Sequence, residues 1–169
     1  VGVRYRNRLD DGKEETPPWR ITALVDGTKL DWSPSPPADA PTSLDAGEVA
    51  VFEAAGPFVV RSQDDAHPFY IAGYMTSCGA VGDIHGAFPG CPGDPEYVNL
   101  IPPKQYLDRY VFFSDPTYPD TNLVLIRKGH DDVTIDCRKE PIDGWQPIGS
   151  SGYEYTRLDL VRGNFEPQG

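Results

Sequence analysis

Two cysteines bracket a stretch near the middle of the chain that is rich in glycine and proline. If Cys78 and Cys91 were oxidised, they would close a loop of about 15 residues, and a cross-link of that size is worth about 3 kcal/mol in the chain-entropy model. The same cysteines, together with Asp83 and His85, have the ligand types of a zinc site, although their spacing matches no usual C-x-x-C arrangement. A disulfide, a metal site and free thiols are all open on these residues alone.

Acidic side chains suggest two further candidate cation sites. Asp64 and Asp65 precede His67, and such a group could touch a divalent cation, but aspartate is also a common turn residue. A second set of acids falls in two turns that could share one end of a sandwich, namely Asp115, Asp120, Asp131 and Asp132. Neither set has EF-hand spacing, so solvated turns are the simpler explanation. We therefore predict no bound metal and no cofactor.

No motif in the sequence indicates catalysis. A G-x-S-x-G elbow, an H-E-x-x-H helix, a Walker loop and a G-x-G-x-x-G turn are all missing from the sequence. Glu48 and Glu53 could be imagined as the carboxylates of a carbohydrate-active hydrolase, but every acidic chain offers such pairs. We predict that the protein is not an enzyme and has no catalytic residues.

Composition limits the class of partner. The chain has 169 residues, 17 glycines, 18 prolines and a formal net charge of −11. This length suits one domain or two small ones. The negative charge repels phosphate backbones and anionic lipid surfaces, so we expect neither nucleic-acid nor membrane partners. No run approaches the roughly 20 apolar residues that a membrane-spanning helix needs.

Short apolar runs separated by turn signals predict an all-β fold. No window of 11 or more residues keeps a 3.6-residue period, and at most residues 103–110 could form a helical turn or two. The fold class is therefore an antiparallel β-sandwich or jelly-roll arrangement with little or no helix. A faint internal echo suggests two related halves, residues 1–92 and 93–169.

Several runs carry more specific predictions. Asp26-Gly27 is a strong hairpin signal, so we expect residues 19–25 and 28–32 to pair as adjacent strands. Residues 133–137 alternate like a strand, which would make Cys137 a small buried thiol. Residues 153–160 change the parity of their apolar positions, which predicts a bulge. Three aromatic residues beside turns could form a contact surface or cap a core: Trp32, Tyr118 and Trp145. We favour the cap for Trp145 and likewise for Trp19.

The stretch from Gly93 to Ser114 organises the rest of the chain. It begins with the turn Gly93-Asp94-Pro95, and the apolar residues that follow stop at Pro102-Pro103, which cannot donate to a sheet ladder. The aromatic and β-branched run Tyr110–Phe113 then suits a pleated surface. We expect this connector to deliver Tyr110–Phe113 into the core of the second half.

This stretch also resembles a known family, the extracellular domains named for the IgG-Fc-binding mucus protein, which has many bacterial relatives. The shared pattern is a Gly-Asp-Pro, an apolar step to proline, a Gln before an aromatic, and Tyr-Val-Phe. Its positions here are Gly93, Asp94, Pro95, Ile101, Pro102, Gln105, Tyr106, Tyr110, Val111 and Phe112. Further similarity lies in residues 58–62, 67–70, 145–149 and 153–160.

The resemblance implies a location and a class of function. Members of this kind are secreted or surface proteins, and that setting favours the Cys78–Cys91 disulfide. A bridge from Cys137 to a cysteine beyond Gly169 is as well supported as a buried thiol. The family pattern continues past Gly169, so the chain is expected to be one domain, residues 1–169, without its last strands.

The expected function is an extracellular binding or adhesion module for a protein or glycan at a surface. The alternatives are a structural subunit of an extracellular fibre or surface assembly, completed by a donated strand, and a carbohydrate-active hydrolase. IgG binding itself is not carried over from the resemblance, because no residue here can be assigned to that contact.

Overall fold

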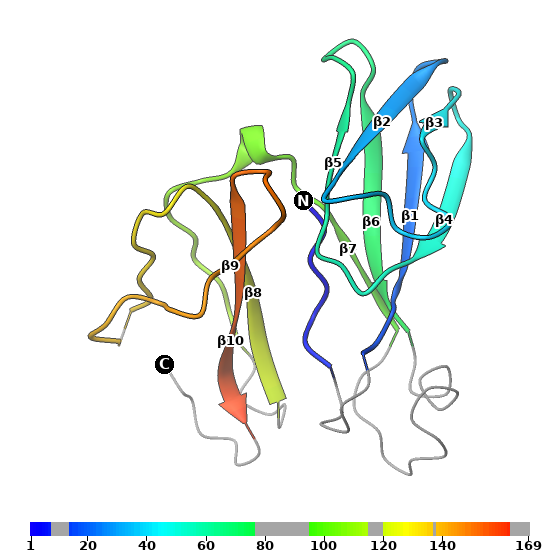
Figure 1. Ribbon diagram of the computed structural model, residues 1–169. Coiled ribbons are helices and arrows are strands. Elements are labelled where there is room, and N and C mark those ends of the chain that lie inside the picture. Colours follow the sequence, from blue (N-terminus) through cyan, green and yellow to red (C-terminus); the bar gives the residue numbers. More distant parts are fainter. Residues whose placement is uncertain (8–13, 77–94, 115–119, 137, 163–169) are drawn as a thin grey trace.

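The computed structural model describes residues 1–7, 14–76, 95–114, 120–136 and 138–162 (Figure 1). Apart from one short 3-10 turn, the regular elements of this part of the chain are strands, which confirms the predicted all-β class. In chain order they are β1 (Pro18–Ala23), β2 (Thr28–Ser33), β3 (Ser43–Leu44), β4 (Val49–Glu53), β5 (Val59–Ser62), β6 (Phe69–Met75), β7 (Glu96–Asn99), η1 (Pro103–Gln105), β8 (Asp120–Lys128), β9 (Gln146–Pro147) and β10 (Tyr153–Arg162).

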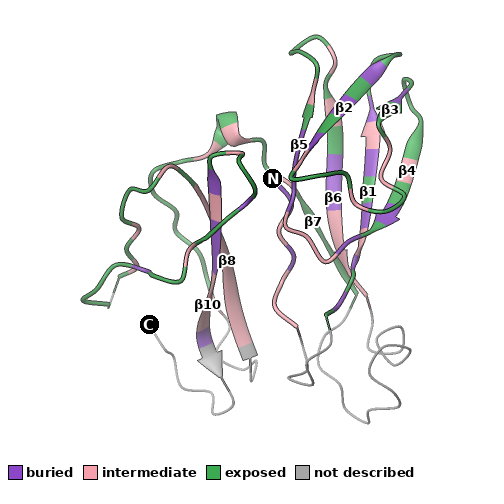
Figure 2. Cartoon of the chain, in the orientation of Figure 1, coloured by how far each residue is buried: buried purple, intermediate pink, exposed green. Residues whose placement is uncertain are grey.

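The first seven strands form a sandwich. One sheet has the strand order β4-β1-β6-β7 and the other has the order β3-β2-β5, with antiparallel ladders throughout. Buried and more exposed residues alternate along β1 and β2, because successive side chains of a strand point to opposite faces (Figure 2). The inward faces of both sheets contribute to one apolar cluster, so this sandwich has a continuous core.

Aromatic rings fill the centre of that core. Phe58 makes edge contacts with Trp19 and Trp32, with ring centroids 4.9 Å and 5.3 Å apart. Each such pair contributes about 0.5–1.5 kcal/mol beyond the burial of its area. The indole N–H of Trp19 donates to the Ala54 carbonyl at 2.9 Å, and that of Trp32 donates to the Pro41 carbonyl at 2.9 Å. The predictions of a surface or capping role for Trp32 and of a capping role for Trp19 are therefore wrong, since both side chains are buried within the core.

The hairpin prediction for Asp26-Gly27 is also wrong. β1 and β2 lie in different sheets, so the turn between them crosses the sandwich and does not close a two-stranded ladder. Gly27 has the positive φ that the turn signal implies, 66°, but its N–H donates to Asp45 Oδ1 at 2.8 Å. A local turn motif specifies the bend, while the neighbour of each strand depends on residues far away in the sequence.

The second region is a smaller sheet with the strand order β8-β10-β9. The ladder between β8 and β10 runs from Tyr153 opposite Lys128 to Arg162 opposite Asp120, and its register shifts between Asp159 and Val161. That shift confirms the predicted bulge. The cluster beneath this sheet contains Ile148, Tyr153 and Tyr155 and is smaller than the core of the sandwich.

The N-terminal segment lies between the two regions (Figure 1). Gly2 exchanges two backbone hydrogen bonds with Phe58, at 2.8 Å and 2.9 Å, on the sandwich side. On the other side Arg157 Nε donates to the Arg4 carbonyl at 3.1 Å. Val1 packs in the cluster of the second sheet. Burial, with a smaller effect from Arg61, lowers the pKa of the Val1 amino group to about 6. Residues 1–7 therefore join the two regions.

The predicted strand at residues 133–137 is wrong over its described part. Residues 131–136 contain no strand, and Val133 accepts a backbone hydrogen bond from Ile142 at 2.8 Å. This segment turns back toward residues 140–145 and does not extend along a neighbour. Cys137 lies outside the described residues, so its predicted burial and bridge stay predictions.

Candidate functional site

The connector between the two regions presents an apolar surface to solvent. Eight apolar side chains along it are exposed (Figure 2): Tyr97, Val98, Ile101, Leu107, Tyr110, Val111, Phe112 and Phe113. We call this set the connector surface. Val111 and Phe113 are 97% and 87% exposed. Single exposed apolar residues are common on proteins, but this many within one short segment is typical of an interaction site.

The first half of the connector is fixed to the sandwich. β7 pairs with β6, and the rings of Tyr97 and Tyr74 stack with centroids 5.9 Å apart. Beyond β7 the Leu100 N–H donates to the Ile71 carbonyl at 3.1 Å. β7 ends at Asn99, and beyond it Pro102 is extended and its carbonyl accepts from the Gln105 N–H at 2.8 Å in the predicted helical turn. These bonds hold the connector surface on an ordered backbone.

Tyr106 fixes the second half of the connector to the smaller sheet. Its ring packs against the cluster that contains Tyr153, and burial raises the pKa of its hydroxyl to about 12. One residue later the chain turns outward, and the Leu107 N–H donates to the Tyr110 hydroxyl at 2.9 Å. The half-buried Tyr106 therefore separates the apolar groups that pack from those that face solvent.

The prediction that Tyr110–Phe113 enters a core is wrong. These residues belong to no strand, and all four side chains are exposed. Their β-branched and aromatic types suit a strand, but β8 takes β10 as its ladder partner. A short run with high strand propensity therefore lacks a partner strand in the part of the chain that the structure describes.

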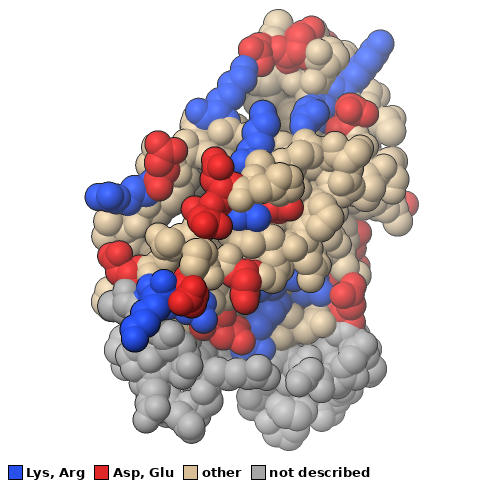
Figure 3. Space-filling model, turned by 60° about the vertical axis from the view of Figure 1, so that its left-hand side comes forward, with Lys and Arg blue, Asp and Glu red and all other residues tan. Residues whose placement is uncertain are grey.

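Few charges interrupt the connector surface. Within residues 107–113 the one acid, Asp108, and the one base, Arg109, cancel. On the face shown in Figure 3, basic and acidic side chains are interspersed among uncharged ones. Lys104 on η1 bonds to Asp65 at 2.7 Å, a fully solvated pair that joins the connector to the β5–β6 loop. Such exposed pairs contribute little stability, so the surface itself is governed by apolar contact.

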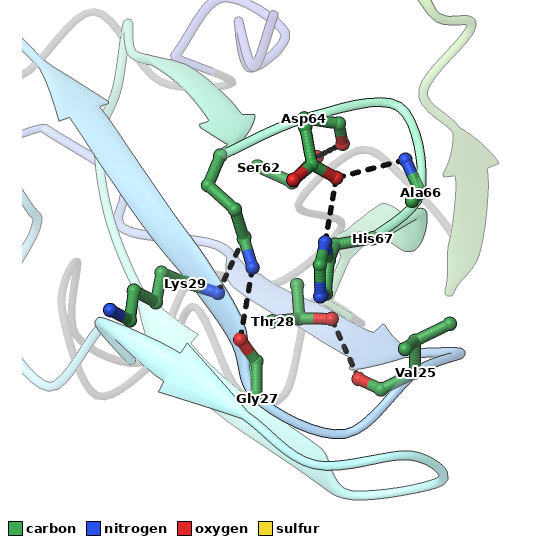
Figure 4. A network of polar contacts seen from close by, with 9 residues as sticks. Val25, Gly27, Thr28, Lys29, Ser62, Asp64, Ala66 and His67 are labelled. Atoms are coloured by element: carbon green, nitrogen blue, oxygen red, sulfur yellow. Dashed lines mark hydrogen bonds and ion pairs between the residues drawn. The ribbon is translucent and has the colours of Figure 1, made fainter.

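A second cluster joins loops at one end of the sandwich (Figure 4). Gln63 bridges two chain segments, since its Oε1 accepts from the Lys29 N–H at 2.8 Å and its Nε2 donates to the Gly27 carbonyl at 3.0 Å. Asp64 Oδ1 lies 2.6 Å from His67 Nδ1 and accepts from the Ala66 N–H at 2.9 Å. The His67 hydrogen bond is the main cause of the lowered pKa of Asp64.

This geometry explains the acids near His67 without a cation. Asp64 is bonded to His67 and to backbone, and Asp65 to Lys104, so the two carboxylates point to different partners. The described residues contain no group of three or more His, Cys, Asp or Glu side chains that could hold a metal ion. The sequence-based candidates Cys78, Asp83, His85, Cys91 and Asp115 lie outside those residues, as does Tyr118, so the Cys78–Cys91 disulfide stays a prediction.

Four other acidic residues were candidates for a hydrolase pair or a cation site, and the structure places each of them in a turn, a loop or a strand end. The Glu48 carboxylate accepts from the Asp45 N–H at 2.9 Å and so closes a turn. Glu53 lies exposed at the end of β4, and Asp131 accepts from Arg127 through its backbone carbonyl at 2.6 Å. Asp132 is exposed in the loop after β8.

Sequence reasoning missed a charged and aromatic cluster on the smaller sheet. The Arg127 guanidinium lies 4.1 Å from the ring centre of Trp145 and donates to Glu154 at 2.8 Å. His130 Nδ1 lies 3.0 Å from the same carboxylate. The Arg127 hydrogen bond, followed by that of His130, lowers the pKa of Glu154. Trp145 is therefore half-buried beneath a cation. The signal for this is the pairing of Arg127 with Glu154 on neighbouring strands, which are far apart in the sequence.

Comparisons with known proteins identify a family. A family model described as IgGFc binding protein matches residues 1–168. No curated protein and no solved structure matches the chain. In the described residues no helix is long and apolar enough to cross a membrane.

Proposed function

Because the chain belongs to the IgGFc binding protein family, we propose that it is an extracellular protein-binding module that contacts its ligand through the connector surface. Family membership supports binding to a protein, and the acidic composition suits a protein that must stay soluble in a secreted setting. The proposal includes a non-catalytic role.

The exposed run Tyr110–Phe113 is the observation that carries this proposal. Aromatic side chains supply large contact areas at a low cost in conformational entropy, and they are enriched among the residues that dominate binding energy. Here two phenylalanines and a tyrosine are at least 47% exposed on a short, uncharged segment. Burying such side chains against a partner would supply most of the favourable free energy of binding.

The same composition favours a protein ligand over a glycan. Sugar recognition combines an aromatic face with several polar groups that satisfy the hydroxyls of the ligand. On the connector surface the Tyr110 hydroxyl already accepts a hydrogen bond from Leu107, and its neighbours Val111, Phe112 and Phe113 are apolar. An apolar patch with few hydrogen-bonding groups is complementary to another apolar protein surface.

Biosensor binding to immobilised IgG Fc, Fab, fibronectin and collagen tests the proposal. We expect the wild-type chain to bind at least one of these proteins with an affinity in the micromolar range or tighter. The double substitution Val111→Lys with Phe113→Lys should weaken that binding tenfold or more, because both side chains would be charged in an apolar contact. Val51→Lys, at an exposed valine of β4, is the matched control and should leave binding unchanged.

The proposal fails if the wild-type chain binds none of the four proteins. It also fails if the double variant and the Val51→Lys control bind equally well, since the connector surface would then make no contact with the ligand.

A further inference from the structure

The strand β8 has a free edge. Among the described residues its only ladder partner is β10, so the backbone N–H and C=O groups of its other edge pair with no strand. The central run Leu123–Ile126 is uncharged, and its side chains on both faces are half-buried. A long apolar edge strand is a template for an added strand.

The connector carries a segment that fits such an edge. Tyr110–Phe113 has the β-branched and aromatic residues that strands prefer, and it forms no ladder in the described structure. Val111 is 97% exposed, so its backbone and side chain are both accessible to another molecule. The described residues thus include a strand edge and a strand-forming run that pair with no strand among them.

We propose that residues 108–113 of one copy add as an antiparallel strand to the free edge of β8 in a second copy, and that the second copy returns the same contact. This rests on the proposed function, because it names a partner for part of the connector surface. The reciprocal arrangement has two-fold symmetry, so each complex gains two added strands.

Charge complementarity selects one register. When Asp108 lies opposite Arg127, Tyr110 falls opposite Leu125 and Phe112 opposite Leu123, so an ion pair and two apolar pairs share one face of the sheet. The next register along would place Asp108 opposite Lys128 but Arg109 opposite Arg127, and like charges directly opposite each other are unfavourable. The predicted register leaves Val111 opposite Val124 on the other face.

The overall charge also favours this contact between copies. Each chain carries −11, so two copies repel one another over most approaches. Tyr110–Phe113 and Leu123–Ile126 are both uncharged, so bringing these two runs together adds no repulsion between like charges. In the described structure the run does not pair with its own β8, so no ladder within one copy competes with this contact.

Sedimentation velocity over a range of concentrations, at physiological salt, tests self-association. We expect a monomer–dimer equilibrium. Val111→Pro should weaken it at least tenfold, because proline has no N–H for the ladder and cannot sit within a central strand. Asp108→Arg should weaken it as well, since two arginines would then face each other. Val51→Lys should associate like the wild type, and because Val111 is almost fully exposed, Val111→Pro is expected to keep the fold.

A photo-crosslink tests the register. With p-benzoylphenylalanine in place of Phe113, a mixture of isotope-labelled and unlabelled chains should give mixed adducts that map to residues 120–128. A chain that stays monomeric at all concentrations, or adducts that form only within one copy or map elsewhere, would overturn the proposal. If the monomer still binds one of the four ligand proteins through the connector surface, the proposed function survives; if it binds none of them, both fail.

Discussion

The sandwich and the smaller sheet differ in how completely each buries its apolar residues. The sandwich has seven strands, and its two sheets enclose one core that contains Trp19, Trp32 and Phe58. The smaller sheet has three strands, one of them only two residues long, and a smaller cluster. Its neighbouring connector leaves strand-forming residues in solvent. The run Tyr110–Phe113, which carries the proposed binding, therefore lies outside the core that stabilises the sandwich.

Two phenylalanines give the largest contrast. Phe58 is 1% exposed and Phe113 is 87% exposed. Phe58→Ala should lower the free energy of unfolding by about 3–5 kcal/mol, whereas an exposed substitution such as Phe113→Ala should change it by less than about 0.5 kcal/mol. Urea unfolding of both variants at low protein concentration measures the difference. Similar losses for the two would mean that the connector is part of the folded core.

The buried amino group of Val1, between the two regions, should make the free energy of unfolding depend on pH. Burial lowers the pKa of the Val1 amino group from 8.0 to about 6, so between these values the unfolded chain binds more protons than the folded one. Stability therefore rises with pH across this window, by up to about 3 kcal/mol for a shift of this size. Urea midpoints at several pH values measure the rise.

N-terminal acetylation provides the control, because it removes the titrating amino group and leaves every side chain of the protein in place. An acetylated chain should lose most of the rise. If the unmodified and acetylated chains show the same dependence on pH, the amino group of Val1 is not buried between the two regions.

Close packing on β6 gives an intermediate effect. A Cβ on Gly73 would lie 2.7 Å from Cζ3 of the Trp19 ring, too close for contact without movement. Gly73→Ala should therefore destabilise the fold by about 1–3 kcal/mol. Val98→Ala on the paired strand β7 is the control, since Val98 is exposed and lies opposite Gly73. Equal thermal midpoints for the two variants would contradict the tight packing of the sandwich.

The smallest effect belongs to ion pairs. Glu154→Gln removes the partner of Arg127 on the smaller sheet, where both side chains are largely enclosed, whereas Asp65→Asn removes a fully solvated pair with Lys104. Glu154→Gln should lower the thermal midpoint more than Asp65→Asn, which should have no measurable effect. Because the folded pKa of Glu154 is lowered, its contribution is present at neutral pH and is lost as pH falls. An equal change in both variants would be inconsistent with this difference.

Local patterns in the sequence predicted local structure well. Alternation along residues 19–25 located β1 and its buried face, while β7 ends at Asn99, before the predicted stop at Pro102-Pro103. The same patterns failed where the pairing of a strand depends on residues far away in the sequence. Asp26-Gly27 has the right turn chemistry, but β1 pairs with β4 and β6 and not with β2. Propensity alone cannot say whether a neighbour strand exists.

The candidate site depends on this kind of failure. Tyr110–Phe113 looks like a core strand because its residue types are those of one, and only the absence of a ladder in the described residues shows it as a surface. Trp145 presents the converse case, since its contact with Arg127 depends on a cross-strand pair that spacing along the chain does not reveal. For Tyr110–Phe113 the residue types alone therefore predicted the wrong environment.

Hydrogen exchange of the connector tests the central claim most directly. At low micromolar concentration without ligand, the amides of residues 111–113 should exchange almost as fast as in an unfolded peptide, while those of residues 20–22 in β1 should be strongly protected. Strong protection of residues 111–113 in the monomer would contradict an exposed connector surface, because it would place those residues in a sheet or a core.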